Sequence, residues 1–60
     1  MNEYIVIDSN IGQCVEFILW DGVSDNGVEQ PYVTQLRDGS IDVGDKVVFD
    51  GNVWIKVQSN

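Results

Sequence analysis

The sequence predicts an all-β protein of five short antiparallel strands. Val and Ile are abundant, whereas Ala is absent and Leu appears only twice, and branching at Cβ favours strands over helices. Six Gly and many Asp and Asn residues divide the chain at spacings typical of short strands. No window shows an apolar stripe at the roughly 3.6-residue period of an amphipathic helix.

The first two strands are predicted at residues 3–8 and 13–20, joined as an antiparallel hairpin. The turn between them, residues 9–12, contains Asn and Gly, which both accept a positive φ. Alternation along the second strand divides its side chains between two faces: Val15, Phe17 and Leu19 on one, and Cys14, Glu16, Ile18 and Trp20 on the other. The first of these faces is the more apolar, so we expect it to face the core.

A polar loop and a third strand follow. Residues 21–30 contain two Gly and no large apolar side chain, and we expect this segment to be the longest and most mobile loop. Pro31 ends the loop and restricts Gln30 to an extended conformation. The third strand is predicted at residues 32–36, where Pro31 at its start removes no ladder hydrogen bond.

The end of the chain contains a turn, a lead-in and the last hairpin: a turn at 37–40, a lead-in at 41–44, and strands at 45–50 and 53–58. A three-residue loop at 50–52 places the apolar side chains of the hairpin on one face: Val47, Phe49, Val53, Ile55 and Val57. The opposite face then carries Lys46, Val48, Trp54 and Lys56. A two-residue loop would instead pair Val47 with Trp54 and split the apolar set. We therefore expect the three-residue loop, with Phe49 opposite Val53 and with Trp54 outside the core.

The five strands are expected to form one domain over residues 1–60. A single flat antiparallel sheet would leave one apolar face in water. Curling into a small open barrel or a β-roll built from hairpins removes that exposure, and packing against a partner protein would do the same.

The net charge of −7, from three Lys and Arg against ten Asp and Glu, excludes several classes of partner. Direct binding of nucleic acid is not expected, because phosphates are bound by Lys and Arg. Anionic membrane surfaces are disfavoured for the same reason, and no stretch approaches the roughly 20 apolar residues of a membrane span. No secretory signal opens the chain, so we expect synthesis in the cytoplasm, and the initial Met predicts a complete gene product.

We predict no enzymatic activity, no cofactor and no metal site. The chain has no His, which is the usual general base and the commonest metal ligand, and a single Cys cannot form an internal disulfide or a thiolate cluster. Two segments, 21–22 and 25–27, are weakly similar to a calcium loop, but the spacing and the closing Glu of such loops are absent. Cys14 is expected to act as a small hydrophobe rather than as a reactive thiol.

Six side chains outside the expected core are predicted to form a contact surface: Tyr4, Ile18, Trp20, Tyr32, Val48 and Trp54. Aromatic side chains are enriched at interface hot spots, although in a small protein they are also core material, and one Trp could plug an end of the barrel. An aromatic platform could also stack on a sugar ring. Unpaired strand edges offer a second means of docking, which a neighbouring chain could complete.

Several segments resemble small proteins of tailed bacteriophages. The opening, Tyr4-Ile5-Val6-Ile7, then Val15 to Ile18 and Leu19-Trp20-Asp21-Gly22-Val23, is similar to two strands followed by a Trp-Asp-Gly motif. The segment Phe49-Asp50-Gly51-Asn52-Val53-Trp54 is similar to their aromatic-Asp-Gly-x-x-aromatic hairpin. The resemblance covers nearly the whole chain, but members of this family carry a Trp and several Pro after Trp-Asp-Gly, and residues 24–30 carry neither. Residues 44–51 separately resemble part of small chitin-binding modules.

Proteins of this phage family are found with tail and tail-fibre genes. The resemblance therefore implies a non-enzymatic bacteriophage virion protein, a small tail- or capsid-associated accessory, adaptor or cementing subunit that acts by protein–protein contact. Its partners would be larger virion proteins or further copies of itself as a homo-oligomer, and its location the virion. Two alternatives stay open: an acidic inhibitor that presents carboxylates to a host nucleic-acid-binding protein in place of DNA phosphates, and a carbohydrate-binding module that uses Trp20 or Trp54.

Overall fold

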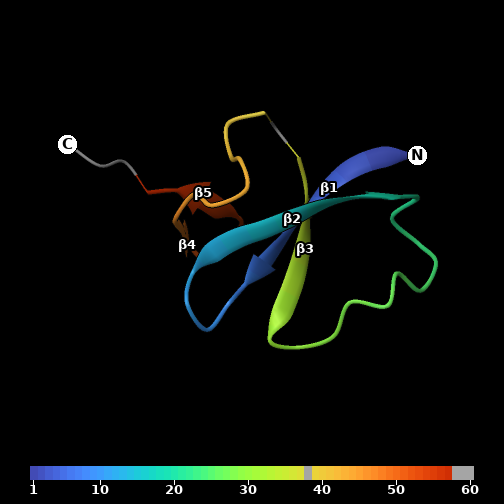
Figure 1. Ribbon diagram of the computed structural model, residues 1–60, viewed down its shortest axis with the longest axis horizontal. Coiled ribbons are helices and arrows are strands. Elements are labelled where there is room, and N and C mark those ends of the chain that lie inside the picture. Colours follow the sequence, from blue (N-terminus) through green and yellow to red (C-terminus); the bar gives the residue numbers. More distant parts are fainter. Residues whose placement is uncertain (38, 58–60) are drawn as a thin grey trace.

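The computed structural model describes residues 1–37 and 39–57, which form two antiparallel sheets and no helix (Figure 1). The strands are β1 (Asn2–Asp8), β2 (Gln13–Trp20), β3 (Tyr32–Leu36), β4 (Val47–Phe49) and β5 (Trp54–Lys56). The larger sheet has the order β2-β1-β3, and the smaller one pairs β4 with β5. The predicted all-β fold of five antiparallel strands is confirmed, as an open roll of two sheets. Asp38 and Gln58, which belong to predicted elements, lie outside the described residues.

The turn of the first hairpin forms as its composition predicts. The N–H of Gly12 donates to the Asp8 carbonyl at 2.8 Å, and the N–H of Asn10 donates to the Asp8 carboxylate at 3.0 Å. Gly12 has a φ of 65°, and a Cβ at this position would lie 2.8 Å from the carbonyl oxygen of Val47. The turn therefore needs Gly both for its conformation and for the close approach of β4.

A β-bulge in the first hairpin decides which side chains enter the core. Val6 pairs with Glu16, but Ile7 pairs with Cys14, so Val15 has no partner on β1. The extra residue shifts the alternation of β2 by one position and turns Cys14 toward the core. The prediction that Cys14 lies opposite the core face is therefore wrong, whereas its prediction as a buried small hydrophobe is confirmed.

The core lies between the two sheets. Its buried members come from β1, β2, β4 and the segment before β4: Ile5, Ile7, Cys14, Ile41 and Val47. Phe17, Val33 and Trp54 pack against this cluster. Most of the other predicted core residues are exposed: Leu19, Phe49, Val53, Ile55 and Val57. The smaller sheet approaches the beginning of β2, where Lys46 bridges to Gln13, and it leaves the far end of β2 uncovered, so that Leu19 is 70% exposed.

The last hairpin differs in register by one residue from the prediction. Phe49 pairs with Trp54 rather than with Val53, and the N–H of Asp50 donates to the Val53 carbonyl at 3.0 Å. The turn thus contains four residues, 50–53, instead of three. The Asp50 carboxylate stabilises this longer turn by accepting hydrogen bonds from the N–H groups of Asn52 and Val53 at 2.8 and 2.9 Å.

This shift reverses the faces of β5 but leaves those of β4 as predicted, because successive side chains in a strand point to opposite sides and the register moves by one residue. Trp54 turns inward and packs against the core, so the prediction that it lies outside is wrong. Its ring centroid lies 5.5 Å from that of Phe49, across the strand pair. Val48 and Ile55 point outward on the opposite face of the same hairpin.

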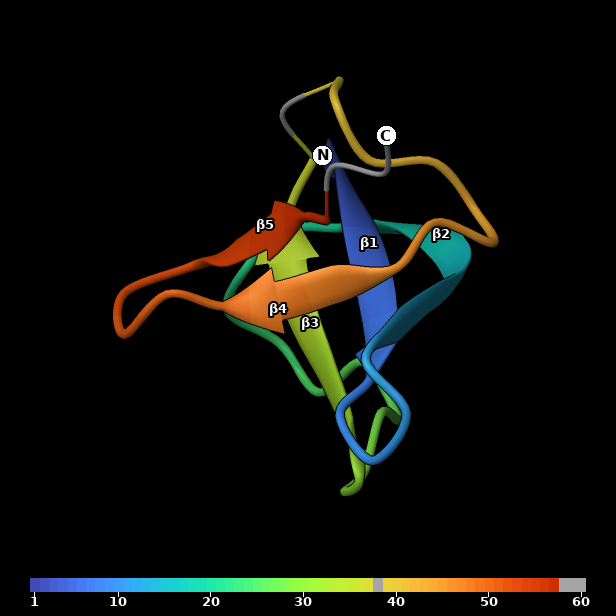
Figure 2. The ribbon, with the colours of Figure 1, turned by 90° about the vertical axis from the view of Figure 1, so that its left-hand side faces the viewer.

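The two sheets are joined along one edge by backbone hydrogen bonds. The Cys14 N–H donates to Asp45 O at 3.0 Å, and the Cys14 carbonyl accepts from Gly44 N–H at 2.8 Å. The Val47 N–H donates to Gly12 O at 2.8 Å. Figure 2 shows the result, with β4 crossing in front of β1 and β3.

On the other edge, a side chain replaces the backbone ladder. The amide of Gln35 on β3 donates to the Trp54 carbonyl at 2.8 Å, and its oxygen accepts from the Trp54 N–H at 2.7 Å. Within the described part of the chain, β5 has no strand pairing with β3. Gln35 therefore stands in for a neighbouring strand at Trp54 and closes the roll.

Candidate functional site

One face of the larger sheet points away from the smaller sheet. Ile5 and Ile7 enter the core, so the side chains between and beside them along β1 point to the opposite side. The strand register places the following residues together on this outer face: Tyr4, Val6, Glu16, Ile18, Trp20, Tyr32 and Leu36. The structure thus brings together four of the predicted contact residues, Tyr4, Ile18, Trp20 and Tyr32.

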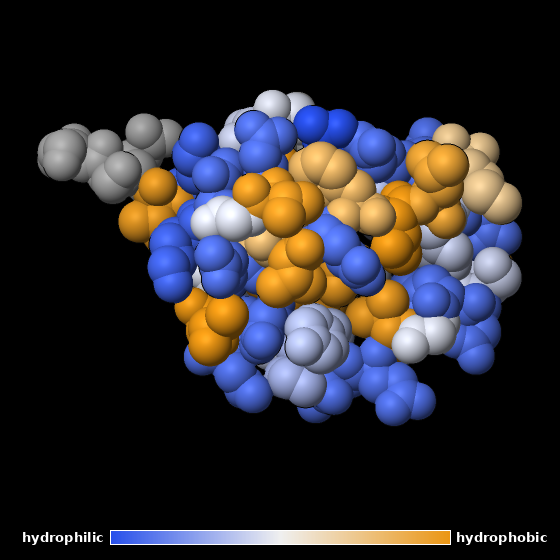
Figure 3. Space-filling model, viewed as in Figure 1, coloured by the Kyte–Doolittle hydropathy of each residue, from blue (hydrophilic) through white to orange (hydrophobic). Residues whose placement is uncertain are grey.

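The other two predicted contact residues lie elsewhere. Val48 is exposed on the outward side of the β4–β5 hairpin. Trp54 packs against the core, so its truncation would remove core contacts together with any interface contact. Figure 3 shows that apolar side chains reach the surface in several patches separated by hydrophilic ones. An interface role for these two residues stays a prediction.

The Trp20 side chain is fixed at one end of the outer face. Its ring meets that of Tyr4 edge to face, with centroids 4.8 Å apart and planes inclined by 67°. Its indole N–H donates to the Ser24 carbonyl at 2.7 Å. Gly22 has a φ of 83°, and a Cβ there would lie 2.7 Å from the Tyr4 hydroxyl. The Trp and Gly of the Trp-Asp-Gly motif therefore both have structural roles where the chain turns after β2.

Asp21 forms the turn at this corner. Its carboxylate oxygen Oδ1 accepts hydrogen bonds from the N–H groups of Val23 and Ser24 at 2.8 and 2.9 Å, and from the Ser24 hydroxyl at 3.0 Å. Asp50 makes the same kind of turn in the last hairpin. Both Asp-Gly motifs behind the phage resemblance are thus explained by local backbone chemistry.

The same kind of hydrogen bond occupies the next polar residues of the loop. The Asp25 carboxylate accepts from the Gly27 N–H at 2.8 Å, and the Asn26 amide oxygen accepts from the Val28 N–H at 2.9 Å. Among the described residues, no three His, Cys, Asp or Glu side chains lie close enough together to hold a metal ion.

The carboxylates that form turns predict a loss of stability in acid. Hydrogen bonds from the backbone of Ser24 and Val23 hold the pKa of Asp21 below its ordinary value of 3.8, and hydrogen bonds from the backbone lower those of Asp45 and Asp50 likewise. Lowered pKa values mean that the folded state binds protons more weakly than the unfolded state. The stabilisation is therefore complete above pH 3.8, the ordinary pKa, and is lost as the pH falls through the lowered pKa values of the folded state.

We expect the urea midpoint to stay level from about pH 7 to pH 5 and to fall below about pH 4. Asp21→Asn keeps the accepting oxygen but removes the titration, so its midpoint should fall less in acid. Glu29→Gln removes a charge from the same loop, at a carboxylate that accepts no hydrogen bond from the described residues, and serves as the control. A pH profile of Asp21→Asn that matches the unmodified protein would contradict this explanation.

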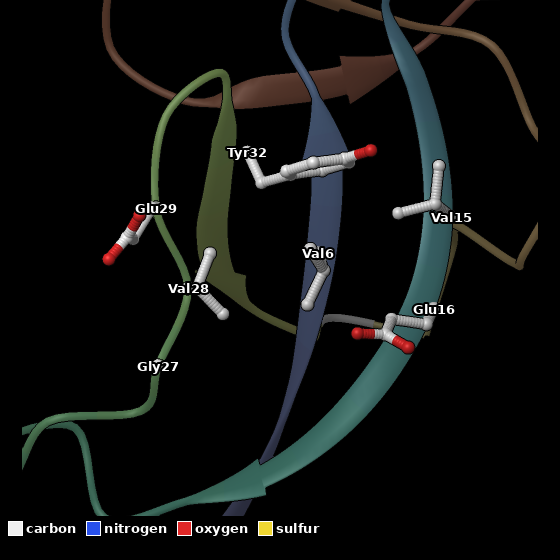
Figure 4. A pocket seen from close by; sticks show the side chains of 7 residues that line it. All are labelled: Val6, Val15, Glu16, Gly27, Val28, Glu29 and Tyr32. Atoms are coloured by element: carbon white, nitrogen blue, oxygen red, sulfur yellow. The ribbon is translucent and has the colours of Figure 1, made fainter.

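A pocket of ≈ 310 Å³ lies on the outer face, between the larger sheet and the loop that follows β2. Six side chains and the backbone of Gly27 line it: Val6, Val15, Glu16, Val28, Glu29 and Tyr32. Figure 4 shows Val6 at the back, Val28 opposite β2, and the Tyr32 ring lying across β1 above Val6. The Glu16 carboxylate points into the pocket, whereas that of Glu29 points outward from the loop.

Two cationic side chains, those of Arg37 and Lys56, are paired with carboxylates outside this pocket. Arg37 forms ion pairs with Glu3 and with Asp42, the latter at 3.4 Å, and its guanidinium lies 4.2 Å from the centre of the Phe17 ring. Lys56 pairs with Asp45 at 3.4 Å. The pocket is lined by Glu16 and Glu29 and by no Lys or Arg, so we expect a negative potential there.

Sequence reasoning missed the pocket and its lining residues Val28 and Glu16. Alternation identifies the face on which Glu16 lies, but the pocket exists only because residues 27–29 pass back over the sheet. The available signal was Val28, one of two Val residues in this polar loop, six residues after Trp-Asp-Gly.

Comparison with known proteins found no matching family model, curated protein or solved structure. No helix in the described part of the chain is long and apolar enough to cross a membrane.

Proposed function

We propose that the protein is a non-enzymatic accessory subunit of a bacteriophage particle, which binds a larger particle protein through its outer face. The phage assignment rests on the order of motifs along the sequence. The binding assignment rests on one observation, the gathering of aromatic and aliphatic side chains on the sheet face that points away from the smaller sheet, where Tyr32 and Leu36 are exposed. Apolar and aromatic side chains that reach the surface are typical of contact sites, and Tyr and Trp are common at their centres.

The outer face is well suited to rigid contact. Trp20 is held by Tyr4 and by its hydrogen bond to Ser24, so little side-chain freedom is lost when a partner covers it. Tyr32 and Leu36 are exposed and would be covered by a partner. Trp20 and Tyr32 lie at opposite ends of the larger sheet, so a partner that contacts both would cover the length of the outer face.

The first test is the presence of the chain in particles. Particles of the phage that encodes it are purified on a density gradient, and the chain is quantified by mass spectrometry. We expect a fixed number of copies per particle. Absence of the chain from intact particles would overturn the proposal.

The second test locates the contact. Leu36→Asp places a charge on the outer face, at a residue that is 51% exposed, and should reduce incorporation into particles by about tenfold or more. Ile55→Asp is the matched control, because it makes the same change at a residue that is 44% exposed on the opposite side. Circular dichroism checks that both variants fold. Equal incorporation of the two variants would exclude the outer face.

The surplus of carboxylates favours a second candidate, the inhibitor that competes with DNA for a host protein. Such binding would weaken steeply with added salt and would be displaced by duplex DNA. However, several carboxylates, including those of Asp21 and Asp50, are engaged in turns rather than presented in a row. Displacement of a bound host protein by duplex DNA would favour this candidate over the particle subunit.

A further inference from the structure

We propose that the pocket on the outer face binds an arginine side chain of the partner protein. This inference rests on the proposed function in one respect, that the outer face meets a protein. It goes further by naming the chemical group that is recognised and the residues that recognise it. Three features carry it: the apolar walls, the carboxylate inside the pocket, and the aromatic ring above it.

The walls suit the aliphatic part of a long side chain. Val6 forms the back of the pocket and is only 2% exposed, and Val15 and Val28 stand on either side. The volume of ≈ 310 Å³ is large enough for one side chain but small for a folded element of a partner. The three methylene groups of an arginine would lie against these valines, as such stems commonly do on apolar surfaces.

The carboxylate supplies the charge. Glu16 points into the pocket, and its side chain has no hydrogen bond or ion pair with the described residues. A neutral apolar ligand would cover this charge without pairing it, which is costly. An anionic ligand would be repelled, because no Lys or Arg lines the pocket. A cationic side chain is therefore the class of ligand that fits.

The aromatic ring distinguishes arginine from lysine. Tyr32 lies across β1 above Val6, and the Glu16 carboxylate lies on the other side of Val6, so that the two groups flank the back of the pocket. An arginine side chain that lies over Val6 would place its length against the ring, and its planar guanidinium could donate two hydrogen bonds to the carboxylate. A lysine ammonium is more strongly hydrated and lacks this planar geometry.

The test uses NMR titration of the full chain with N-acetyl-arginine amide at low salt. We expect saturable shifts of the backbone amides of Val6, Glu16 and Val28, with a dissociation constant in the millimolar range that is typical of so small a ligand. N-acetyl-citrulline amide, which has nearly the same shape without the charge, should bind about tenfold more weakly. Equal binding of N-acetyl-lysine amide would overturn the assignment to arginine.

Variants of the pocket sharpen the result. Glu16→Gln should weaken arginine binding about tenfold, whereas Asp25→Asn, which removes the same charge from the nearby loop, should have little effect. Tyr32→Phe should bind as the unmodified protein does, and Tyr32→Leu several-fold more weakly, because the ring face rather than the hydroxyl makes the contact. Arginine binding that Glu16→Gln leaves unchanged would overturn the proposal.

The outcomes separate this inference from the function on which it builds. If Leu36→Asp blocks incorporation into particles but arginine does not bind, the outer face works without this pocket. If arginine binds in a Glu16-dependent way but the chain is absent from particles, the pocket is real and its partner lies elsewhere.

Discussion

Replacing Ile41 with alanine is expected to unfold much of the protein at 25 °C. Ile41 is 1% exposed and packs with Ile5, Ile7 and Cys14 between the two sheets, although it belongs to neither. Truncation of a buried Ile to Ala usually costs about 2–5 kcal/mol. A domain of this size has only about 3–5 kcal/mol of stability from its core, so the loss approaches the total.

The matched control is Ile11→Ala, the same truncation at a residue that is 55% exposed in the turn after β1. It should lower the free energy of unfolding by less than about 0.5 kcal/mol. Urea unfolding followed by Trp fluorescence measures both variants, since Trp54 packs against the same core. Similar midpoints for the two variants would show that Ile41 does not hold the sheets together.

Replacing Gln35 with leucine is expected to cost about 2 kcal/mol or more. The substitution leaves the N–H and the carbonyl of Trp54 without their partners in a half-buried site, and each unsatisfied group costs about 1–3 kcal/mol when fully buried. Gln13→Leu is the control, because the Gln13 side chain makes a single exposed hydrogen bond, to Gly44 O at 2.9 Å. That change should cost less than about 1 kcal/mol.

Gln35→Glu separates hydrogen bonding from packing. At neutral pH the introduced carboxylate accepts from the Trp54 N–H but repels the Trp54 carbonyl. Protonation restores a donor, so the carboxyl should have a raised pKa in the folded state. The stabilising form is the protonated carboxyl. Its contribution is fully present below the unfolded-state pKa of about 4.3 and is lost as the pH rises through the folded-state pKa. The deficit relative to the unmodified protein should therefore shrink on acidification, and a constant deficit from pH 7 to about pH 4 would contradict this account.

The strands that alternation and turn composition specify could be predicted from the sequence. The segments 13–20 and 32–36 match β2 and β3, and the turn that ends at Gly12 follows from its Asn and Gly. The core was predicted poorly, because alternation along a strand decides which side chains are buried, and a shift of one residue changes the answer. Val15 has no partner on β1, so the β2 residues before it point to the opposite side from the one that simple alternation predicts. The sequence of β2 contains no Gly or other residue that would indicate a bulge at this position.

The last hairpin and Ile41 show two further limits. The apolar pattern favours a three-residue loop, but the two hydrogen bonds to the Asp50 carboxylate and the packing of Phe49 on Trp54 stabilise a turn one residue longer. Ile41 lies between strands, where no periodicity marks it as buried.

The candidate site was predictable in part. Alternation alone brings Tyr4, Ile18, Trp20 and Tyr32 to one face once the strands are paired. The pocket could not be predicted, because it depends on the path of residues 27–29 over the sheet, and that path is set by turns and side-chain contacts rather than by strand alternation.

The two edges along which the sheets meet are held by different numbers and kinds of hydrogen bond. Three backbone hydrogen bonds tie the segment 44–47 to residues 12–14 at the start of β2, whereas the hydrogen bonds described between β5 and β3 are the two made by the Gln35 amide. Swinging the β4–β5 hairpin away from β3 would break no strand pairing and would preserve the register of both sheets. Loss of the Gln35 hydrogen bonds would therefore free β5 from β3 while residues 12–14 still held the hairpin, and it would expose Trp54, which Gln35 contacts.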